Sequence, residues 1–327
     1  MLKLSFLSLI TFVNLMGMEE IKEDEKCISL LKVEKNPQHV TMLAQEAETA
    51  AYFYAGCDEK GPFIKLWDHK TGKCYSVVNL TIAPNSLAAG GGKIFFSTHG
   101  NFISIVNYKK NVFEQAICIK DCDSIDAIAC DKTGDTIFLV SCRGVWKYDG
   151  KPCYLSDADN DDLMLYPQIA CSPDGKKVAV SYIAKTSDQS NNMYTKQCTK
   201  ILDLSSKEKK WIPVQYSVRP YKDWDTFPEC VTALGFSPGN FIVCSKDKSI
   251  AIFDSRTWKK IDLRQDGKLV SELKLDLPDN TNIVSFVWLP GTQLYMIGRD
   301  SNVYNRYGQY NNNGSINLSI QIKLPTK

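Results

Sequence analysis

Short apolar runs alternate with polar turns along most of the chain. Runs such as AAYFYAG, KIFFSTH, TIFLVSC and KKVAVSY are rich in apolar, β-branched and aromatic residues, and glycine, proline, aspartate or asparagine stands near their ends. Residues of these types in that order favour strands that end in tight turns. After the first 17 residues, no segment shows the spacing of apolar positions that an amphipathic helix requires. The pattern therefore predicts an all-β protein.

The turns recur at a regular interval. Six turn segments, each followed by an apolar run, are centred on Glu48, Gly91, Gly134, Gly175, Gly239 and Gly291. Their separations are 43, 43, 41, 64 and 52 residues, and most units offer four short strands. A unit of about 40 to 45 residues with four strands is typical of a β-propeller blade. We therefore expect a single propeller of six blades, because a ring covers sheets that cannot bury both faces alone.

The two ends of the repeat region decide how the ring closes. The third strand of the sixth unit is expected at SNVYNRY, residues 301–307. The run KCISLLKVE, residues 26–34, lies outside the six units and is expected to pair as an outer strand with the last one. If this run pairs instead with part of residues 310–324, the ring would have seven blades.

Three stretches resemble the WD-repeat family of propellers. SPDGKKVAVSY, CSKDKSIAIFDSRT and IKLWDHKTGKC are similar to the turn, the middle hairpin and the third strand of that family's repeat. The likeness extends over residues 40–324 and is strongest in the first and fifth units. The resemblance implies structural roles for the matching residues, which are Asp58, Trp67, Asp68, Asp174, Asp247 and Asp254.

The chain departs from this family in its polar residues. The family often joins a tryptophan, a strand serine or threonine, a histidine and a turn aspartate by hydrogen bonds. Here Ala55 and Val243 replace the strand hydroxyl, and Phe253 replaces the tryptophan of the fifth unit. His39 is the only histidine that fits. Blade stability should therefore depend more on apolar packing than on buried polar chains.

Two long connections border the fourth unit and form the predicted binding site. Residues 184–197 are expected to join its second and third strands, and residues 215–229 to join it to the next unit. In a WD-type propeller these connections emerge on the same face. Arginine, methionine and aromatic residues are enriched where proteins bind one another. The residues predicted to bind a protein or peptide partner are Met193, Tyr194, Arg219, Tyr221, Lys222, Trp224 and Phe227. The alternative is that these aromatic side chains pack on their own blade.

An acidic stretch, SDADNDDLMLYP, is expected on the same face. Its aspartates alternate at Asp157, Asp159 and Asp161, but the glycine and glutamate of a calcium-binding EF-hand loop are missing. A solvated acidic loop, which could equally serve as a negative rim for a basic partner, therefore explains the stretch better than a metal site.

Catalysis has little support in the sequence. His39, His69 and His99 fall in different units at different phases, and no GxSxG, P-loop or HExxH motif occurs. The alternative is a lactonase-like hydrolase with a metal in the central channel, but the first strands, such as VTMLA and IDAIAC, are largely apolar. We therefore expect a non-catalytic, cofactor-free protein-binding platform.

The net charge and the N-terminal residues indicate which partners to expect and where in the cell the protein acts. The formal net charge of +2 is too small to attract nucleic acid, so we expect no nucleic-acid partner. We also expect a monomer. The apolar run from Leu4 to Met16 extends for about 20 Å as a helix, which is too short to cross a membrane. We therefore expect a signal peptide at residues 1–17, an acidic linker at 18–26 and the propeller at 27–324, with no membrane insertion once the leader is removed. The protein would then be exported, and an intracellular scaffold in the cytoplasm is the alternative.

The cysteines argue against a disulfide framework. The chain has 12 cysteines, and none has the spacing of a zinc site. Cys130 and Cys171 occupy the place before a turn that Phe236 occupies in another unit. A place that accepts cysteine or phenylalanine is typical of an apolar core position, so most cysteines are expected to be buried thiols.

Overall fold

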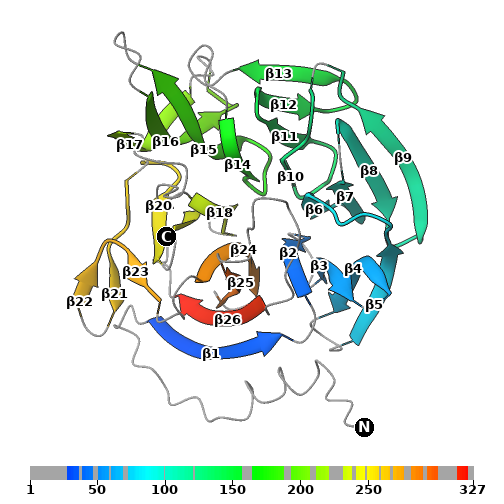
Figure 1. Cartoon of the computed structure of the whole chain (residues 1–327), viewed down its shortest axis with the longest axis horizontal. Coiled ribbons are helices and arrows are strands. Elements are labelled where there is room, and N and C mark those ends of the chain that lie inside the picture. The colour runs from blue at the N-terminus through cyan, green and yellow to red at the C-terminus, as the bar shows by residue number, and fades with distance from the viewer. Residues whose placement is uncertain are drawn as a thin grey trace.

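In the computed structural model of the chain, antiparallel four-stranded sheets surround a central axis (Figure 1). This arrangement confirms the all-β propeller fold that the repeat predicted. The structure describes residues 28–322 except 37–38, 47–50, 59, 69–72, 99, 121, 157–163, 188–192, 207–210, 221–230, 238–240, 247–248, 258, 266–267, 276–280, 290–292 and 301–314.

The described residues form six four-stranded sheets, which we number by the order of their innermost strands along the chain. The first contains β2 (His39–Gln45), β3 (Ala51–Asp58), β4 (Gly61–Asp68) and β5 (Lys73–Asn79). The second contains β6 (Ser86–Gly90), β7 (Lys93–Ser97), β8 (Phe102–Asn107) and β9 (Val112–Cys118). The third contains β10 (Ala127–Cys130), β11 (Ile137–Ser141), β12 (Gly144–Tyr148) and β13 (Pro152–Ser156).

The other three sheets follow the same plan with local changes. The fourth contains β14 (Met164–Cys171), β15 (Lys177–Ser187), β16 (Met193–Asp203) and β17 (Trp211–Pro220). The fifth contains β18 (Val231–Phe236), β19 (Phe241–Lys246), β20 (Ser249–Asp254) and β23 (Leu273–Lys274). A separate hairpin, β21 (Leu263–Gln265) and β22 (Lys268–Val270), is inserted before β23. The sixth contains β24 (Thr281–Leu289), β25 (Gln293–Asp300), β26 (Ser315–Ile322) and β1 (Ile28–Asn36).

The first strand of the chain completes the last sheet. β1 pairs antiparallel with β26 from Ile28 opposite Ile322 to Asn36 opposite Ser315. β1 takes the outer-strand position expected for residues 26–34, but its partner is residues 315–322, the pairing that we expected to give a seventh blade. That expectation is wrong for the described residues, because β26 belongs to the same sheet as β24 and β25. The expected third strand at residues 301–307 lies outside the described residues, and β26 pairs with β25 at that place in the sheet.

Apolar side chains fill the space between neighbouring sheets. Phe138 and Val140 of the third sheet share one buried cluster with Val178 and Val180 of the fourth. Similar clusters join the first sheet to the second, the second to the third, and the fourth to the fifth. The sheets therefore depend on one another for burial of their faces, as expected when one small sheet cannot shield both sides.

Near the axis the sheets approach closely enough to require glycine. A Cβ atom on Gly134, whose φ is +68°, would lie 2.4 Å from the carbonyl oxygen of Gly90 in the preceding sheet. Hydroxyl groups join other inner strands: Ser86 Oγ accepts the Ile128 amide at 2.6 Å, and Ser285 Oγ accepts the Leu43 amide at 3.0 Å. The second pair joins the sixth sheet to the first and so completes the ring.

Candidate functional site

The fourth sheet carries the predicted binding residues and has unusually long strands. β15 and β16 have eleven residues each and β17 has ten, whereas β11 and β12 of the third sheet have five each. Six extra residues at about 3.3 Å each lengthen a strand by about 20 Å. We call residues 185–187, 193–197 and 215–220, at the end of β15, β16 and β17, the extension.

The extension corrects the sequence-based expectation of two long loops. Residues 184–187 and 193–197 are paired strand residues, and 188–192 lie outside the described residues. Residues 215–220 likewise belong to β17 rather than to a connection. Threonine, serine, tyrosine and valine alternate in these segments, and such residues extend a hairpin readily once its base is paired.

The register brings together residues that were predicted from two separate segments. Met193 lies opposite Ser187, and Tyr194 lies opposite Pro220. Thr195 lies opposite Arg219, so Met193, Tyr194 and Arg219 share the same end of the sheet. The other predicted partner-binding residues, Tyr221, Lys222, Trp224 and Phe227, lie outside the described residues.

The base of the extension is closely packed. Tyr182, Ile183, Ala184 and Cys198 are at most 4% exposed. A buried hydroxyl pair, Ser181 Oγ to Thr199 Oγ1 at 3.0 Å, joins β15 to β16. Sequence reasoning missed this pair, because it searched for a strand hydroxyl in the first and fifth units. A buried, paired base supports the extension rigidly at its attachment to the ring.

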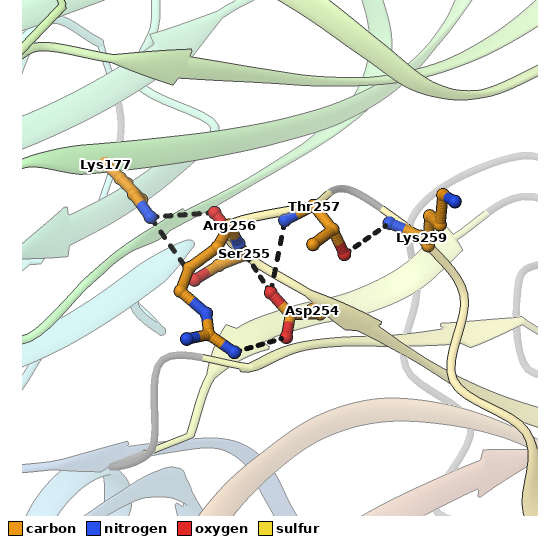
Figure 2. A network of polar contacts seen from close by, with 6 residues as sticks. All are labelled: Lys177, Asp254, Ser255, Arg256, Thr257 and Lys259. Carbon is orange, nitrogen blue, oxygen red and sulfur yellow. Dashed lines mark hydrogen bonds and ion pairs between the residues drawn. The ribbon is translucent and has the colours of Figure 1, made fainter. Parts of the chain in front are cut away.

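A polar network holds the fourth sheet to the fifth at the end of the strands opposite the extension (Figure 2). Lys177, the first residue of β15, donates from Nζ to the Ser255 carbonyl at 2.7 Å. Asp254 ends β20 and accepts the amides of Arg256 and Thr257 at 2.7 and 3.2 Å. The Arg256 guanidinium donates to the same carboxylate at 3.2 Å.

This network lowers the pKa of the Asp254 carboxyl group. Partial burial alone would raise its pKa, but the two amides and the Arg256 guanidinium outweigh burial and lower the pKa below its ordinary value. The carboxylate is therefore charged at neutral pH and fixes the turn after β20. The fifth sheet then presents an ordered turn to Lys177.

Asp174 organises the turn between β14 and β15. Its carboxylate accepts the Ser172 hydroxyl at 2.7 Å and the Lys176 amide at 3.1 Å. The small burial of Asp174 raises its pKa, but these hydrogen bonds and the nearby lysines lower it overall.

The remaining WD-type positions are described in part. Trp67 is buried, and its ring centroid lies 5.4 Å from that of Tyr52. Asp58 and Asp68 end β3 and β4. Asp247 lies outside the described residues.

A second polar contact between sheets was not foreseen from the sequence. Glu46, directly after β2, is 2% exposed and accepts the Gly92 amide at 2.5 Å and the Tyr108 hydroxyl. Lys109 Nζ lies 3.6 Å from the same carboxylate. Glu46 therefore joins the first sheet to the second at the same end of the strands as the network of Figure 2. The sequence predicts only a turn centred on Glu48, and nothing near Glu46 indicates partners that are 46 to 63 residues away.

The residues considered for catalysis and metal binding are described only in part. None of them form a group of three or more His, Cys, Asp or Glu that could hold a metal ion. His39 lies in β2, whereas His69, His99 and residues 157–163 are outside the described part. No helix in that part is long and apolar enough to cross a membrane.

The thiols do not all follow the expectation of burial. Of the eight cysteines whose side chains the structure describes, Cys122 and Cys198 are buried. Cys130 and Cys171 end β10 and β14 as Phe236 ends β18, and burial raises the pKa of both thiols. Three cysteines are exposed, namely Cys57 on the inner part of the first sheet and Cys118 and Cys153 on the outer strands β9 and β13.

Comparison with known proteins gives similarity in structure alone. No protein-family model and no curated protein matches the sequence. Among solved structures, the WD40 repeats of RRP9 superpose with a TM-score of 0.54 at 10% sequence identity, and the match covers 90% of this chain and 97% of that one. A chain of the nidogen/laminin complex gives a TM-score of 0.49 at 12% identity and covers 69% of this chain and 79% of that one. The first match agrees with the WD-type propeller fold implied by the sequence.

Proposed function

We propose that this chain is a non-catalytic platform that binds a protein or peptide partner on one face of a six-bladed propeller. The binding surface would consist of the extension and the adjoining connections, residues 188–192 and 221–230. The observation that carries the proposal is the register of β16 with β17, which pairs Tyr194 with Pro220 and Thr195 with Arg219 at one end of the sheet. Protein-binding surfaces are enriched in aromatic, methionine and arginine side chains, and aromatic and arginine side chains are frequent at their hot spots.

The rest of the ring would act as a rigid support. Buried clusters and the contacts of Lys177 and Glu46 fix neighbouring sheets to one another. A fixed support lowers the entropy lost when the extension binds, because fewer groups must be ordered. The proposal includes export after removal of residues 1–17, which would place the surface outside the cytoplasm.

The partner must first be identified, and the site can then be tested. The mature chain, used as bait on material from its source, would yield partners by affinity capture and mass spectrometry. The best partner is then titrated against a variant that combines Arg219→Ala with Trp224→Ala. We expect affinity to fall at least about 100-fold, since two hot-spot truncations each cost about 2 kcal/mol or more.

A matched variant controls for general surface effects. Arg256→Ala with Val112→Ala removes another exposed arginine and another exposed apolar side chain, which lie in the turn after β20 and on β9. This control should bind as the native chain does, and both variants should remain folded at the temperature of the binding assay, since loss of the exposed Arg256–Asp254 pair costs about 1 kcal/mol or less. Equal affinity for native chain and test variant would reject the site, and unfolding of the test variant would favour the packing role.

A further inference from the structure

Among the side chains that the structure describes, five of the six large exposed apolar ones belong to the first two sheets or the connection between them, and the sixth is Tyr154 on β13. Tyr75 on β5 and Ile82 in the connection after it are each 46% exposed. Phe102 on β8 and Phe113 on β9 are 51% and 58% exposed. These residues belong to the outer parts of the first and second sheets, which are neighbours in the ring (Figure 1).

The register shows that Tyr75 is on the side of the first sheet that faces the second. Tyr75 lies opposite Leu66, and Leu66 lies opposite Phe53. Residues directly opposite one another share a face of the sheet. Phe53 and Leu66 pack in the cluster between the first and second sheets, so Tyr75 continues this apolar side outward.

The same reasoning applies to the second sheet. Phe113 lies opposite Val106, which packs in the cluster with the first sheet. Ile103 packs toward the third sheet instead, so the adjacent Phe102 points toward the first. Ala116 and Cys118, both exposed on β9, lie opposite Ser104 and Phe102. We call Tyr75, Ile82, Phe102, Phe113, Ala116 and Cys118 the rim patch.

The rim patch itself contains no charged residue, whereas exposed Lys109 and Lys110 stand in the turn just before Phe113. Residues 74–92 contain no Asp, Glu, Lys or Arg. Glu114 is the only such residue in β9, and Lys93 lies 3.8 Å from its carboxylate. The residues of the patch would thus bring no like charges together in a contact with a second copy. The net charge of +2 on the whole chain adds little repulsion between copies.

We propose that the rim patch is the apolar centre of an interface between two copies of this chain, in place of the monomer expected from the sequence. A two-fold interface places the same surface on both partners, which suits a surface without net charge. Fully covered aromatic side chains bury 150–250 Å² each, so four half-exposed side chains supply roughly 400 Å². A standard interface needs about 800 Å² per partner, so neighbouring polar groups would supply the remainder as a rim.

The contact would use side chains rather than strand pairing. β9 has a bulge at Glu114, where the register with β8 shifts between Ile105 and Val106. A bulge and a charge in an edge strand oppose continuous pairing with another chain. The proposal concerns the rim of the first two sheets and does not depend on the partner-binding surface of the fourth.

The mass of the purified chain in solution tests the proposal. Light scattering after size exclusion, over about a 100-fold range of protein concentration, should show a mass that rises from one chain to two. The variant Phe102→Glu with Phe113→Glu should remain at the mass of one chain throughout. Val112→Glu is the matched control, because Val112 is 50% exposed on the same strand but lies opposite Asn107, on the other face of the sheet. This control should associate as the native chain does.

A second measurement needs no variant. The exposed thiol of Cys118 belongs to the rim patch, whereas the exposed thiol of Cys153 lies on β13 outside it. The rate of maleimide labelling at Cys118 should fall at least about threefold as the protein associates, while labelling of Cys153 stays constant. A native chain that keeps the mass of one chain at every concentration would overturn the proposal. Association that the control abolishes as well as the test variant, or equal protection of both thiols, would also overturn it.

Discussion

Truncation of Phe138 should show how strongly one sheet depends on its neighbour. Phe138 is 0% exposed on β11 and packs in the cluster that the third and fourth sheets share. Buried Phe→Ala substitutions cost about 3 to 5 kcal/mol, because transfer energy is lost and a cavity remains. We expect Phe138→Ala to lower the free energy of unfolding by about 4 kcal/mol, near the middle of that range.

Urea denaturation, followed by tryptophan fluorescence and by circular dichroism, gives this free energy if the two transitions coincide. Val112→Ala, at a side chain that is 50% exposed, is the control and should change the free energy by no more than about 0.5 kcal/mol. A double-mutant cycle with Val178→Ala should show a coupling energy of at least about 0.5 kcal/mol across the two sheets. A loss below about 1.5 kcal/mol for Phe138→Ala, or a coupling near zero, would refute the packing described between these sheets.

Three further perturbations test the contacts between sheets and their turns. Gly134 and Gly100 have similar φ values of +68° and +70°, but a Cβ added at Gly134 would meet Gly90, whereas one added at Gly100 would meet nothing within 4 Å. Gly134→Ala should therefore lower the melting temperature clearly more than Gly100→Ala. Equal losses would contradict the close approach of the two sheets. Asp254→Asn should lower the free energy of unfolding by about 1 kcal/mol or less at pH 7. Because the pKa of Asp254 is lowered in the folded chain, the difference in free energy between variant and native chain, measured by urea titration, should shrink as the pH falls below about 4. A difference that does not change with pH would contradict a role for the charge of Asp254. Maleimide should label exposed Cys153 of the native chain long before Cys130, because burial raises the pKa of the Cys130 thiol. Mass spectrometry maps the labelled sites, and equal labelling rates would contradict the burial of Cys130.

The regular features of the fold were accessible from the sequence because each unit repeats the same local physics. The recurring turn before an apolar strand placed Cys130, Cys171 and Phe236 at the ends of three inner strands, where the structure has them. The same period predicted four-stranded sheets around a ring and an outer strand from the start of the chain. Periodicity reports what the units share, so it is reliable for the scaffold.

The features that distinguish one unit from another were harder to predict. Residues 193–197 are polar enough to suit either a loop or an exposed hairpin, and only pairing with β15 and β17 decides between them. Glu46 is buried because Gly92 and Tyr108 come from another sheet, and a sequence pattern within one unit contains no information about them. The candidate site is therefore known in part: Met193, Tyr194 and Arg219 have a position in the fold, and their role awaits a partner.

Closure of the ring by β1 is the feature on which the whole account most depends. Amide hydrogen exchange of the chain, read by mass spectrometry on peptides that cover residues 28–36, tests it directly. We expect these amides to exchange as slowly as those of β25 and β26, because β1 is paired with β26 along its length. Exchange of residues 28–36 within seconds, while β25 stays protected, would contradict the closed ring.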